Sequence, residues 1–290
     1  MQSHFKNMAT SLARLRPSMR VICRAQRRCL SESTSKDMIR KYGILMTGGP
    51  PDHLRSYGDY GQMMEDMLSS PVATNEEWHK WTCFENEFPR EDELGEMTGI
   101  IITGSRFDAH GTDDWICRLR EVIREVYHTP NCYGEYRRIL GICFGHQIVS
   151  NALGGVSGPT EVGWQLGVQH IDFNDHFHAM FPPLKYISNL PILKLHQDQV
   201  HELPPDGTLL ASSCNTPIEM YSVGENVLCV QGHPEFETEY LRKVVEHRHK
   251  DGKIPDEAKN ICMRSTHDPE SYKTIKSWNT LLRKWLVKEW

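Results

Sequence analysis

The chain has 290 residues, a net charge of −5 and 24% charged residues, and its length fits one large α/β domain or two small ones. The balanced charge lacks the basic excess of nucleic-acid-binding proteins, so we expect no nucleic-acid partner. No window approaches the roughly 18 consecutive apolar residues that a membrane-spanning helix needs, so we expect no membrane partner.

The N-terminal segment differs in composition from the rest. Residues 1–31 contain seven lysines and arginines and no acidic residue. This composition is typical of an organelle transit peptide, with a disordered basic leader as the alternative. We therefore exclude residues 1–38 from the fold. The nine cysteines are scattered without a C-x-x-C pair, which favours reduced thiols and a cytoplasmic location. A transit peptide would instead direct the chain to a mitochondrion or plastid.

Short apolar runs alternate with amphipathic stretches in the first half of the chain. The expected strands are residues 42–47, 81–84, 99–103 and 138–142. The expected helices are residues 58–68, 115–127 and 144–153. Continuous apolar strands that alternate with helices predict a parallel sheet covered on both faces.

The second half changes character, because its apolar runs lie close together with turn residues between them. The runs are residues 165–172, 192–196, 208–212, 218–222 and 227–231. They predict an antiparallel extension of the sheet. Residues 236–249 then read as a helix, and a second helical pattern spans 278–286. Residues 131–137 read as a loop insertion.

The segment Gly-Ile-Cys-Phe-Gly around Cys143 joins a predicted buried strand directly to a predicted helix. A side chain on so sharp a turn stands up at the carboxyl edge of the sheet, and glycines two before and two after it leave room for the turn. The helix N-terminus beside the sulfur favours thiolate over thiol. The amide of Phe144 would point to where an oxyanion forms. The pattern therefore predicts Cys143 as a nucleophile.

A partner for this cysteine is expected from a distant part of the chain. His233 and Glu235 follow the apolar strand 227–231 in the sequence Gln-Gly-His-Pro-Glu. A histidine at a strand end can reach a thiol across the sheet edge. The carboxylate two residues later can accept a hydrogen bond from the far ring nitrogen and stabilise the imidazolium. We therefore predict His233 as the base and Glu235 as its orienter.

The two motifs GICFGHQ and QGHPE resemble those of the class I glutamine amidotransferase family. The family pattern is G-x-C-x-G-x-Q for the nucleophile and H-P-E for the base and its partner, and both occur here in the expected order. Longer segments resemble the plant-type γ-glutamyl peptidases, a branch of that family that removes glutamate from glutathione and its conjugates. These segments are ITGSRFDAHGTDDWI, LGICFGHQI, KLHQDQV, LPPDGTLLASS and VLCVQGHPEF.

The resemblance covers residues 40–250 and carries an expected fold with it. The fold is a three-layer α/β/α arrangement of the flavodoxin-like type, with a mixed, mostly parallel central sheet. Residues 39–252 would then form a type-1 glutamine amidotransferase domain, and residues 253–290 a C-terminal helical extension.

The resemblance also implies roles for individual residues. It assigns Cys143 as nucleophile, His233 as general base and then acid, and Glu235 as orienter. The backbone N–H of Phe144 and the loop at Gly104 and Ser105 would form the oxyanion hole. The family usually has Gly-Gly at the loop positions, so Ser105 is a departure that leaves the backbone donor in place.

Four further positions match residues that touch the bound glutamyl group in relatives. They are Gln147, His196, Gln197 and Asp198. The last three also fit a simple turn at a strand end. No spacing of metal ligands is present, so we expect no metal and no cofactor.

These residues predict a hydrolase that cuts a γ-glutamyl amide bond through a thioester on Cys143, with a small γ-glutamyl compound as its only partner. A glutaminase that supplies ammonia to a separate synthetase is the first alternative, although no obligatory protein partner is predicted. A non-catalytic binding protein on the same fold is the second, because a fold alone does not determine function.

Overall fold

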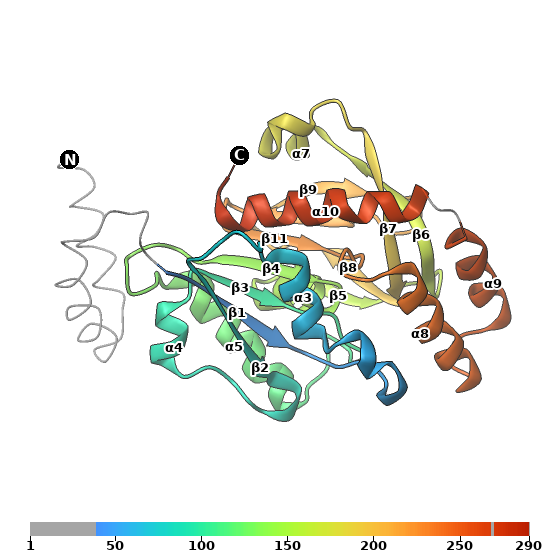
Figure 1. Ribbon diagram of the computed structural model, residues 1–290, viewed down its shortest axis with the longest axis horizontal. Coiled ribbons are helices and arrows are strands. Elements are labelled where there is room, and N and C mark those ends of the chain that lie inside the picture. Colours follow the sequence, from blue (N-terminus) through green and yellow to red (C-terminus); the bar gives the residue numbers. More distant parts are fainter. Residues whose placement is uncertain (1–38, 268–269, 290) are drawn as a thin grey trace.

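The computed structural model describes residues 39–267 and 270–289, so the predicted leader at 1–38 lies outside the described residues. A nine-stranded sheet runs through the described part of the chain between two sets of helices (Figure 1). Its strand order is β2-β1-β3-β4-β11-β10-β9-β6-β7. The three-layer, mostly parallel arrangement predicted from the sequence is therefore confirmed.

Five neighbouring strands of this sheet are parallel. They are β2 (Glu76–Thr82), β1 (Arg40–Met46), β3 (Gly99–Ile102), β4 (Arg138–Ile142) and β11 (Val227–Val230). The predicted strand at 81–84 was misplaced, since residues 83–85 form a 3-10 turn instead. β2 lies at the edge of the sheet, and all seven of its residues are half-buried. The charged residues of β2 interrupt its apolar pattern, and for this reason the strand was misplaced.

The other four strands continue the sheet in antiparallel pairings. They are β10 (Met220–Val223), β9 (Gly207–Ser212), β6 (Gln165–Phe173) and β7 (Asn189–His196). The predicted antiparallel extension is confirmed for these four strands, with strand ends displaced by up to three residues. The fifth predicted run, residues 227–231, is β11, which pairs antiparallel with β10 but parallel with β4. A separate pair, β5 (Val156–Pro159) with β8 (Asp198–Glu202), was not predicted. Both of its strands are short, with too few apolar residues for a periodic pattern.

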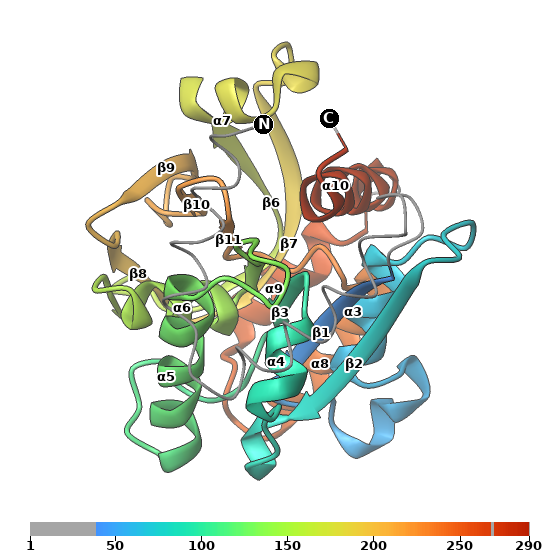
Figure 2. The ribbon, with the colours of Figure 1, turned by 90° about the vertical axis from the view of Figure 1, so that its left-hand side faces the viewer.

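Helices cover both faces of the sheet (Figure 2). One face carries α4 (Glu91–Glu96), α5 (Asp114–His128) and α6 (Phe144–Ala152), and the other carries α3 (Tyr60–Leu68), α7 (Asp175–Met180) and α10 (Glu270–Val287). Helices α8 (Thr238–Lys250) and α9 (Asp256–Ser265) pack beside β6 and β7. The 3-10 turns are η1 (Asp52–Tyr57), η2 (Cys83–Glu85) and η3 (Pro182–Leu184). Within the described ranges, no helix is long and apolar enough to cross a membrane.

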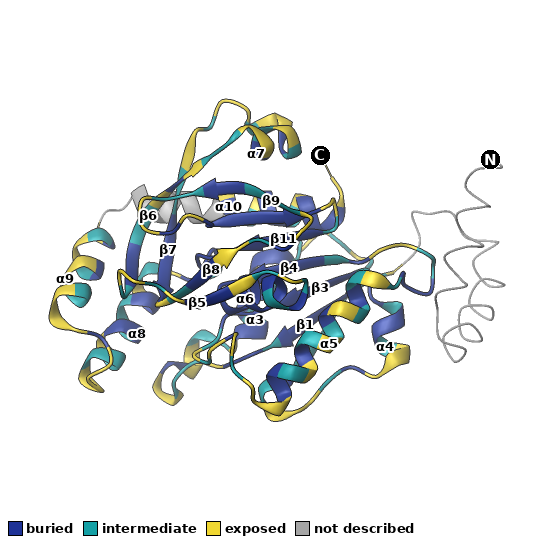
Figure 3. Ribbon diagram, turned by 180° about the vertical axis from the view of Figure 1, so that it is seen from behind, coloured by how far each residue is buried: buried dark blue, intermediate teal, exposed yellow. Residues whose placement is uncertain are grey.

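Strand β3 shows why the sheet is buried on both faces. Ile101 packs with the cluster under α3 and α10, whereas Ile100 and Ile102 pack with the cluster under α5 and α6. Successive side chains of a strand point to opposite faces, so a run of three isoleucines serves both layers. The central strands are accordingly buried, while exposed residues follow the outer side of α5 (Figure 3).

The C-terminal helix α10 packs on the sheet rather than projecting from it. Trp278, Leu282 and Trp285 are at most 3% exposed and join the core beneath α3. The indole N–H of Trp278 donates to the backbone oxygen of Pro191 on β7 at 2.9 Å. Arg283 contacts Glu76 of β2 with Nη2–Oε1 at 2.9 Å. The tail therefore completes the hydrophobic core of the domain.

Replacing Trp278 by alanine is expected to lower the free energy of unfolding by about 3–5 kcal/mol, because a fully buried indole leaves a cavity. Chemical denaturation measures this change. Trp278→Phe, which keeps most of the buried surface and loses the hydrogen bond to Pro191, should cost much less. Equal stability of wild type and Trp278→Ala would contradict the packing of α10 described above.

Candidate active site

The residues predicted to act together meet at the carboxyl edge of the parallel strands. β4 and β11 pair in parallel, with Ile142 opposite Val230. The segments that follow these two strands therefore leave the sheet side by side. The backbone N–H of Cys143 donates to the carbonyl of Val230 at 2.9 Å. This pairing brings the segments carrying Cys143 and His233 together across 90 positions of sequence.

Cys143 occupies a strained turn between β4 and α6. It is the N-cap residue of α6, with φ 53° and ψ −102°, in the left-handed region that non-glycine residues rarely adopt. Added Cβ atoms at Gly141 and Gly145 would lie 2.6 Å from the Gly145 carbonyl oxygen and 2.3 Å from the Ile102 carbonyl oxygen, respectively. Glycine is needed at both positions because backbone fills the space around the turn.

Gly145→Ala is expected to lower the free energy of unfolding by about 1–3 kcal/mol, since the new methyl group would overlap the backbone of β3. The midpoint of urea unfolding measures the effect. Gly49→Ala is the matched control, because a Cβ there meets no atom within 4 Å and should change stability by no more than about 0.5 kcal/mol. Equal effects of the two substitutions would show that the turn has room to adjust.

The imidazole of His233 is held from several sides. Its Nδ1 lies 2.8 Å from Oε1 of Glu235, and its backbone N–H donates to the carbonyl of Leu193 at 2.7 Å. The ring of Phe236 stacks on it with the centroids 4.1 Å apart and the planes 3° from parallel. The side chains of His233 and Glu235 are 4% and 2% exposed. The ring therefore has little freedom to rotate, and its Nε2 is directed away from Glu235.

The electrostatic setting of His233 favours the imidazolium. Burial lowers the pKa of this ring, but the charges of Cys143 and Glu235 and the hydrogen bonds to both side chains outweigh it. Together they raise the pKa of His233 to about 10. At neutral pH the ring of His233 is therefore protonated and can donate a proton to a group that reacts beside Cys143.

The loop after β3 closes against this pair. An added Cβ at Gly104 would lie 2.8 Å from Cε1 of His233 and 3.6 Å from Cβ of Cys143, so only glycine fits there. The hydroxyl of Thr47 lies 3.0 Å from the Gly104 carbonyl oxygen, and the hydroxyl of Ser105 donates to the Thr47 carbonyl at 2.6 Å. The serine that replaces the usual glycine thus ties the loop to the end of β1.

Two backbone donors at this edge are available to a ligand. Across the described residues, nothing accepts a hydrogen bond from the amide N–H of Phe144 or of Ser105. Phe144 opens helix α6, where the first amide groups have no partner within the helix. A carbonyl oxygen placed between Cys143 and these amides would meet the positive end of the helix dipole.

The structure brings three of the four predicted substrate-binding residues together. Nε2 of Gln147 donates to the carbonyl of Asp198 at 2.8 Å, and Nδ1 of His196 lies 3.0 Å from the same oxygen. Gln197 is exposed, and its carbonyl accepts from the N–H of Thr160 at 2.8 Å. Burial, with the nearby charge of Lys194, lowers the pKa of His196 well below its ordinary value, so this ring is neutral at neutral pH.

The sequence analysis did not identify three interactions that hold the segments at this edge of the sheet. Thr47 holds the Gly104 loop, and Phe236 stacks on His233. The third is a fully buried ion pair between Lys194 of β7 and Glu219, whose backbone oxygen accepts from the N–H of Gln231 at 2.8 Å. A lysine within the apolar run Ile-Leu-Lys-Leu was the available signal for that pair, since lysine is rarely buried without a partner.

The loop at residues 131–137, which the sequence marks as an insertion, does not line the site. The N–H of Cys132 donates to the carbonyl of Gly95 at 2.8 Å, and that of Arg138 to Thr98 at 3.1 Å. These contacts lie where β3 and β4 begin, at the edge of the sheet opposite to Cys143. The five residues of β4 separate this loop from Cys143.

No group of three or more His, Cys, Asp or Glu side chains is arranged to hold a metal ion in the part of the chain that the structure describes. The seven described cysteines are free thiols. Cys143, His233 and the two free amides can support nucleophilic attack by a thiolate, with the histidine as proton carrier and the amides for a developing oxyanion.

Comparisons with known proteins identify the family and the fold. The family model described as "Glutamine amidotransferase class-I" matches residues 59–249. Gamma-glutamyl peptidase 3 of Arabidopsis thaliana is 36% identical over 190 residues, covering 64% of this chain and 74% of the relative. Gamma-glutamyl peptidase 4 of the same plant is 33% identical over 199 residues, or 66% and 74% of the two chains. The crystal structure of a glutamine amidotransferase from Methylobacillus flagellatus has the same fold, with a TM-score of 0.67 at 15% identity over 87% of this chain and 95% of that one.

Proposed function

This chain belongs to the class I glutamine amidotransferase family and is a hydrolase, and from that premise we propose that it cleaves the γ-glutamyl amide bond of glutathione, its conjugates or related γ-glutamyl peptides. The observation that carries the proposal is the convergence of Cys143, His233 and Glu235 at one sheet edge. The names of the relatives support a γ-glutamyl substrate, since both are called γ-glutamyl peptidases.

In the first step, the Cys143 thiolate attacks the γ-carbonyl carbon of the substrate. The new carbon–sulfur bond pushes the carbonyl electrons onto oxygen, where the amides of Phe144 and of the Gly104 loop would stabilise the charge. His233, protonated at neutral pH because its pKa is raised, donates a proton to the leaving nitrogen. The carbon–nitrogen bond then breaks, and a γ-glutamyl thioester remains on Cys143.

The second step uses the same imidazole in the opposite direction. Formation of the thioester removes the negative charge of Cys143, which is one of the causes of the raised pKa of His233. The pKa of this ring therefore falls in the acyl-enzyme, and the neutral ring can take a proton from water. The hydroxide attacks the thioester carbon, the carbon–sulfur bond breaks with its electrons returning to sulfur, and glutamate leaves, so that the thiolate–imidazolium pair is restored.

Incubation of the protein with glutathione, a glutathione S-conjugate or glutamine, each at the same concentration, tests the proposal by the rate of glutamate release. We expect faster release from one of the two peptides than from glutamine. Faster release from glutamine would instead favour a glutaminase that supplies ammonia to a separate synthetase. No release from any of the three would favour a binding protein and would overturn the proposal.

A further inference from the structure

A buried ion pair joins two distant parts of the sheet. Nζ of Lys194 on β7 bonds to the carboxylate of Glu219, and neither side chain has any exposed surface. The hydroxyl of Ser213, just after β9, completes the cluster, because it accepts from Nζ of Lys194 at 3.0 Å and donates to Oε1 of Glu219 at 2.5 Å. The proposed reaction uses none of these three groups.

The turn that carries His233 packs directly against β7. In the sheet, β10, β9 and β6 lie between β11 and β7, and β6 and β7 run across the direction of the central strands (Figure 1). The N–H of His233 nevertheless donates to the carbonyl of Leu193 on β7 at 2.7 Å. An added Cβ at Gly232 would lie 2.7 Å from side-chain atoms of Ile192, so this close approach requires glycine. The far edge of the sheet therefore curls back onto the turn after β11.

Each member of the ion pair adjoins a hydrogen bond to this turn. Lys194 follows Leu193, whose carbonyl accepts from His233. On the other side of the turn, the backbone carbonyl of Glu219 accepts from the N–H of Gln231 at 2.8 Å. The segment from Gln231 to His233 is therefore held by two backbones, one on β7 and one at Glu219. The side chains of Lys194 and Glu219 tie these two backbones together.

A second predicted site residue lies on the same strand. His196 follows Lys194 by two positions on β7, so their side chains share one face of the strand. Burial lowers the pKa of His196, and the charges of Lys194 and His233 lower it further. The three groups are therefore close enough to interact, and a change in the position of β7 would alter the surroundings of both histidines.

Packing alone does not account for two charges at this place. Burial removes their hydration, and it lowers the pKa of Lys194 although the charge of Glu219 opposes that shift. Apolar residues of similar volume are often as stabilising as a buried ion pair, or more so. A hydrogen-bonded pair of charges differs from an apolar contact because it has a defined distance and direction. It can therefore fix one separation of the two backbones that it joins.

We propose that Lys194 and Glu219 are positioning residues that hold His233 against Cys143. The pair sets the separation of Leu193 and Glu219, and these two residues hold the turn that carries the imidazole. This inference rests on the proposed role of His233 as proton carrier. Without the pair the imidazole would lose its defined position, and a displacement of about 1 Å can reduce the rate roughly 100-fold.

The double variant Lys194→Met, Glu219→Leu tests this role, because it removes both charges and leaves neither one uncompensated. We expect its Tm to stay within about 5 °C of wild type. We also expect kcat/KM to fall roughly 100-fold for the γ-glutamyl peptide that the wild type cuts fastest. A double variant with the Tm and the kcat/KM of the wild type would overturn the proposal.

A matched control removes a similar pair at the opposite edge of the parallel strands. Lys41, near the start of β1, lies with its Nζ 2.7 Å from Oε2 of Glu96. The double variant Lys41→Met, Glu96→Leu makes the same chemical change there and should keep full activity. An equal loss of kcat/KM in the two double variants would show a general effect of lost ion pairs and would refute the positioning role.

Alkylation of Cys143 by iodoacetamide reports the same geometry without a substrate. A cysteine beside a protonated imidazole reacts faster than an isolated thiol, so the rate constant at pH 7 should fall at least about tenfold in Lys194→Met, Glu219→Leu. Mass spectrometry of the Cys143 peptide measures it, and the half-buried Cys117 on α5 should react as in the wild type. A wild-type protein that releases no glutamate would refute the proposed function and leave this measurement intact. An unchanged Cys143 rate in an active enzyme would refute the positioning role alone.

Ser213→Ala is a milder change that decides the question if the double variant does not fold. It removes only the hydroxyl that bonds to both charges, and we expect the Cys143 rate constant and kcat/KM to fall roughly 3- to 10-fold. Ser212→Ala changes the neighbouring half-buried serine and should leave both values unchanged. Wild-type values in Ser213→Ala, with the double variant unfolded, would count against the proposal.

Discussion

Cys143→Ala is expected to reduce kcat for glutamate release by roughly 10⁴–10⁶-fold, the range found when an essential nucleophile or its partner is removed. Without the sulfur no thioester can form, and the amides of Phe144 and the Gly104 loop can only polarise the substrate for direct attack by water. Initial rates at saturating substrate, with the γ-glutamyl peptide that the wild type cuts fastest, measure the loss. KM should change little, because the amides and the pocket remain.

A matched control is available in the same chain. Cys214 is an exposed free thiol, so Cys214→Ala makes the same chemical change away from the sheet edge and should retain full activity. Both variants should unfold near the wild-type temperature, which shows that the loss is chemical rather than structural. A Cys143→Ala enzyme that retained more than about a tenth of the wild-type rate would exclude a thioester on this residue.

The part of the site that the sequence could predict depends on local geometry. The strand–cysteine–helix turn requires the two flanking glycines, and the structure shows backbone oxygens within 2.6 Å of where their Cβ atoms would be. His233 and Glu235 are two residues apart, so one rigid turn sets the distance of 2.8 Å between Nδ1 of His233 and Oε1 of Glu235. Such features are fixed by a few neighbouring residues, and short motifs therefore reveal them.

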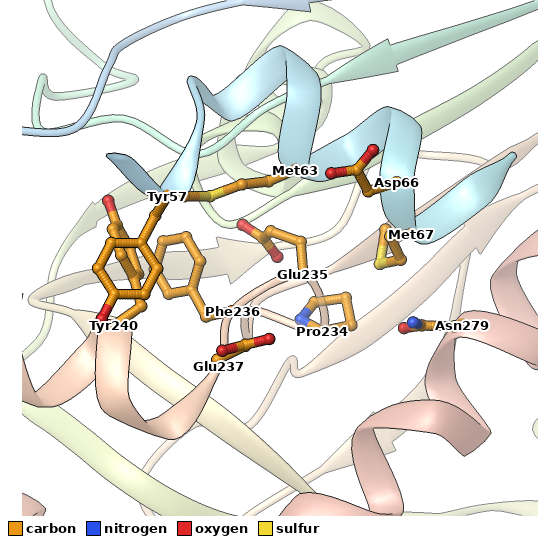
Figure 4. A pocket seen from close by; sticks show the side chains of 10 residues that line it. All are labelled: Tyr57, Met63, Asp66, Met67, Pro234, Glu235, Phe236, Glu237, Tyr240 and Asn279. Atoms are coloured by element: carbon orange, nitrogen blue, oxygen red, sulfur yellow. The ribbon is translucent and has the colours of Figure 1, made fainter. Parts of the chain in front are cut away.

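The remaining features depend on contacts between distant segments. Arg283 bonds to Glu76 across 207 positions, and this pair helps to hold α10 against the edge strand that the apolar pattern misplaced. A cavity of about 270 Å³ beside Glu235 combines α3, the turn after β11 and α10 (Figure 4). No single window of sequence contains all of these walls, so the cavity could not be predicted before the fold was known.

Glu235→Gln should reduce kcat/KM by roughly 10⁴-fold, as expected when the orienting carboxylate of a triad becomes an amide. It should also move the alkaline limit of activity to lower pH. The imidazolium is lost as the pH rises through the pKa of His233, which the Glu235 charge helps to raise. With a neutral amide in its place that pKa is lower, so activity should disappear at a lower pH than in the wild type. Profiles of kcat/KM against pH measure both effects.

Two further variants separate charge from position at this residue. Glu235→Asp keeps the negative charge but shortens the side chain by one methylene, so the carboxylate lies farther from His233 and activity should fall. The alkaline limit of activity should move less in this variant than in Glu235→Gln, because the charge is retained. Glu237→Gln removes an exposed charge two residues away and should leave both the rate and the limit close to wild type. If Glu235→Gln and Glu237→Gln gave the same pH profile, the carboxylate of Glu235 would not be what sustains the imidazolium, and another group would have to stabilise the charge on His233.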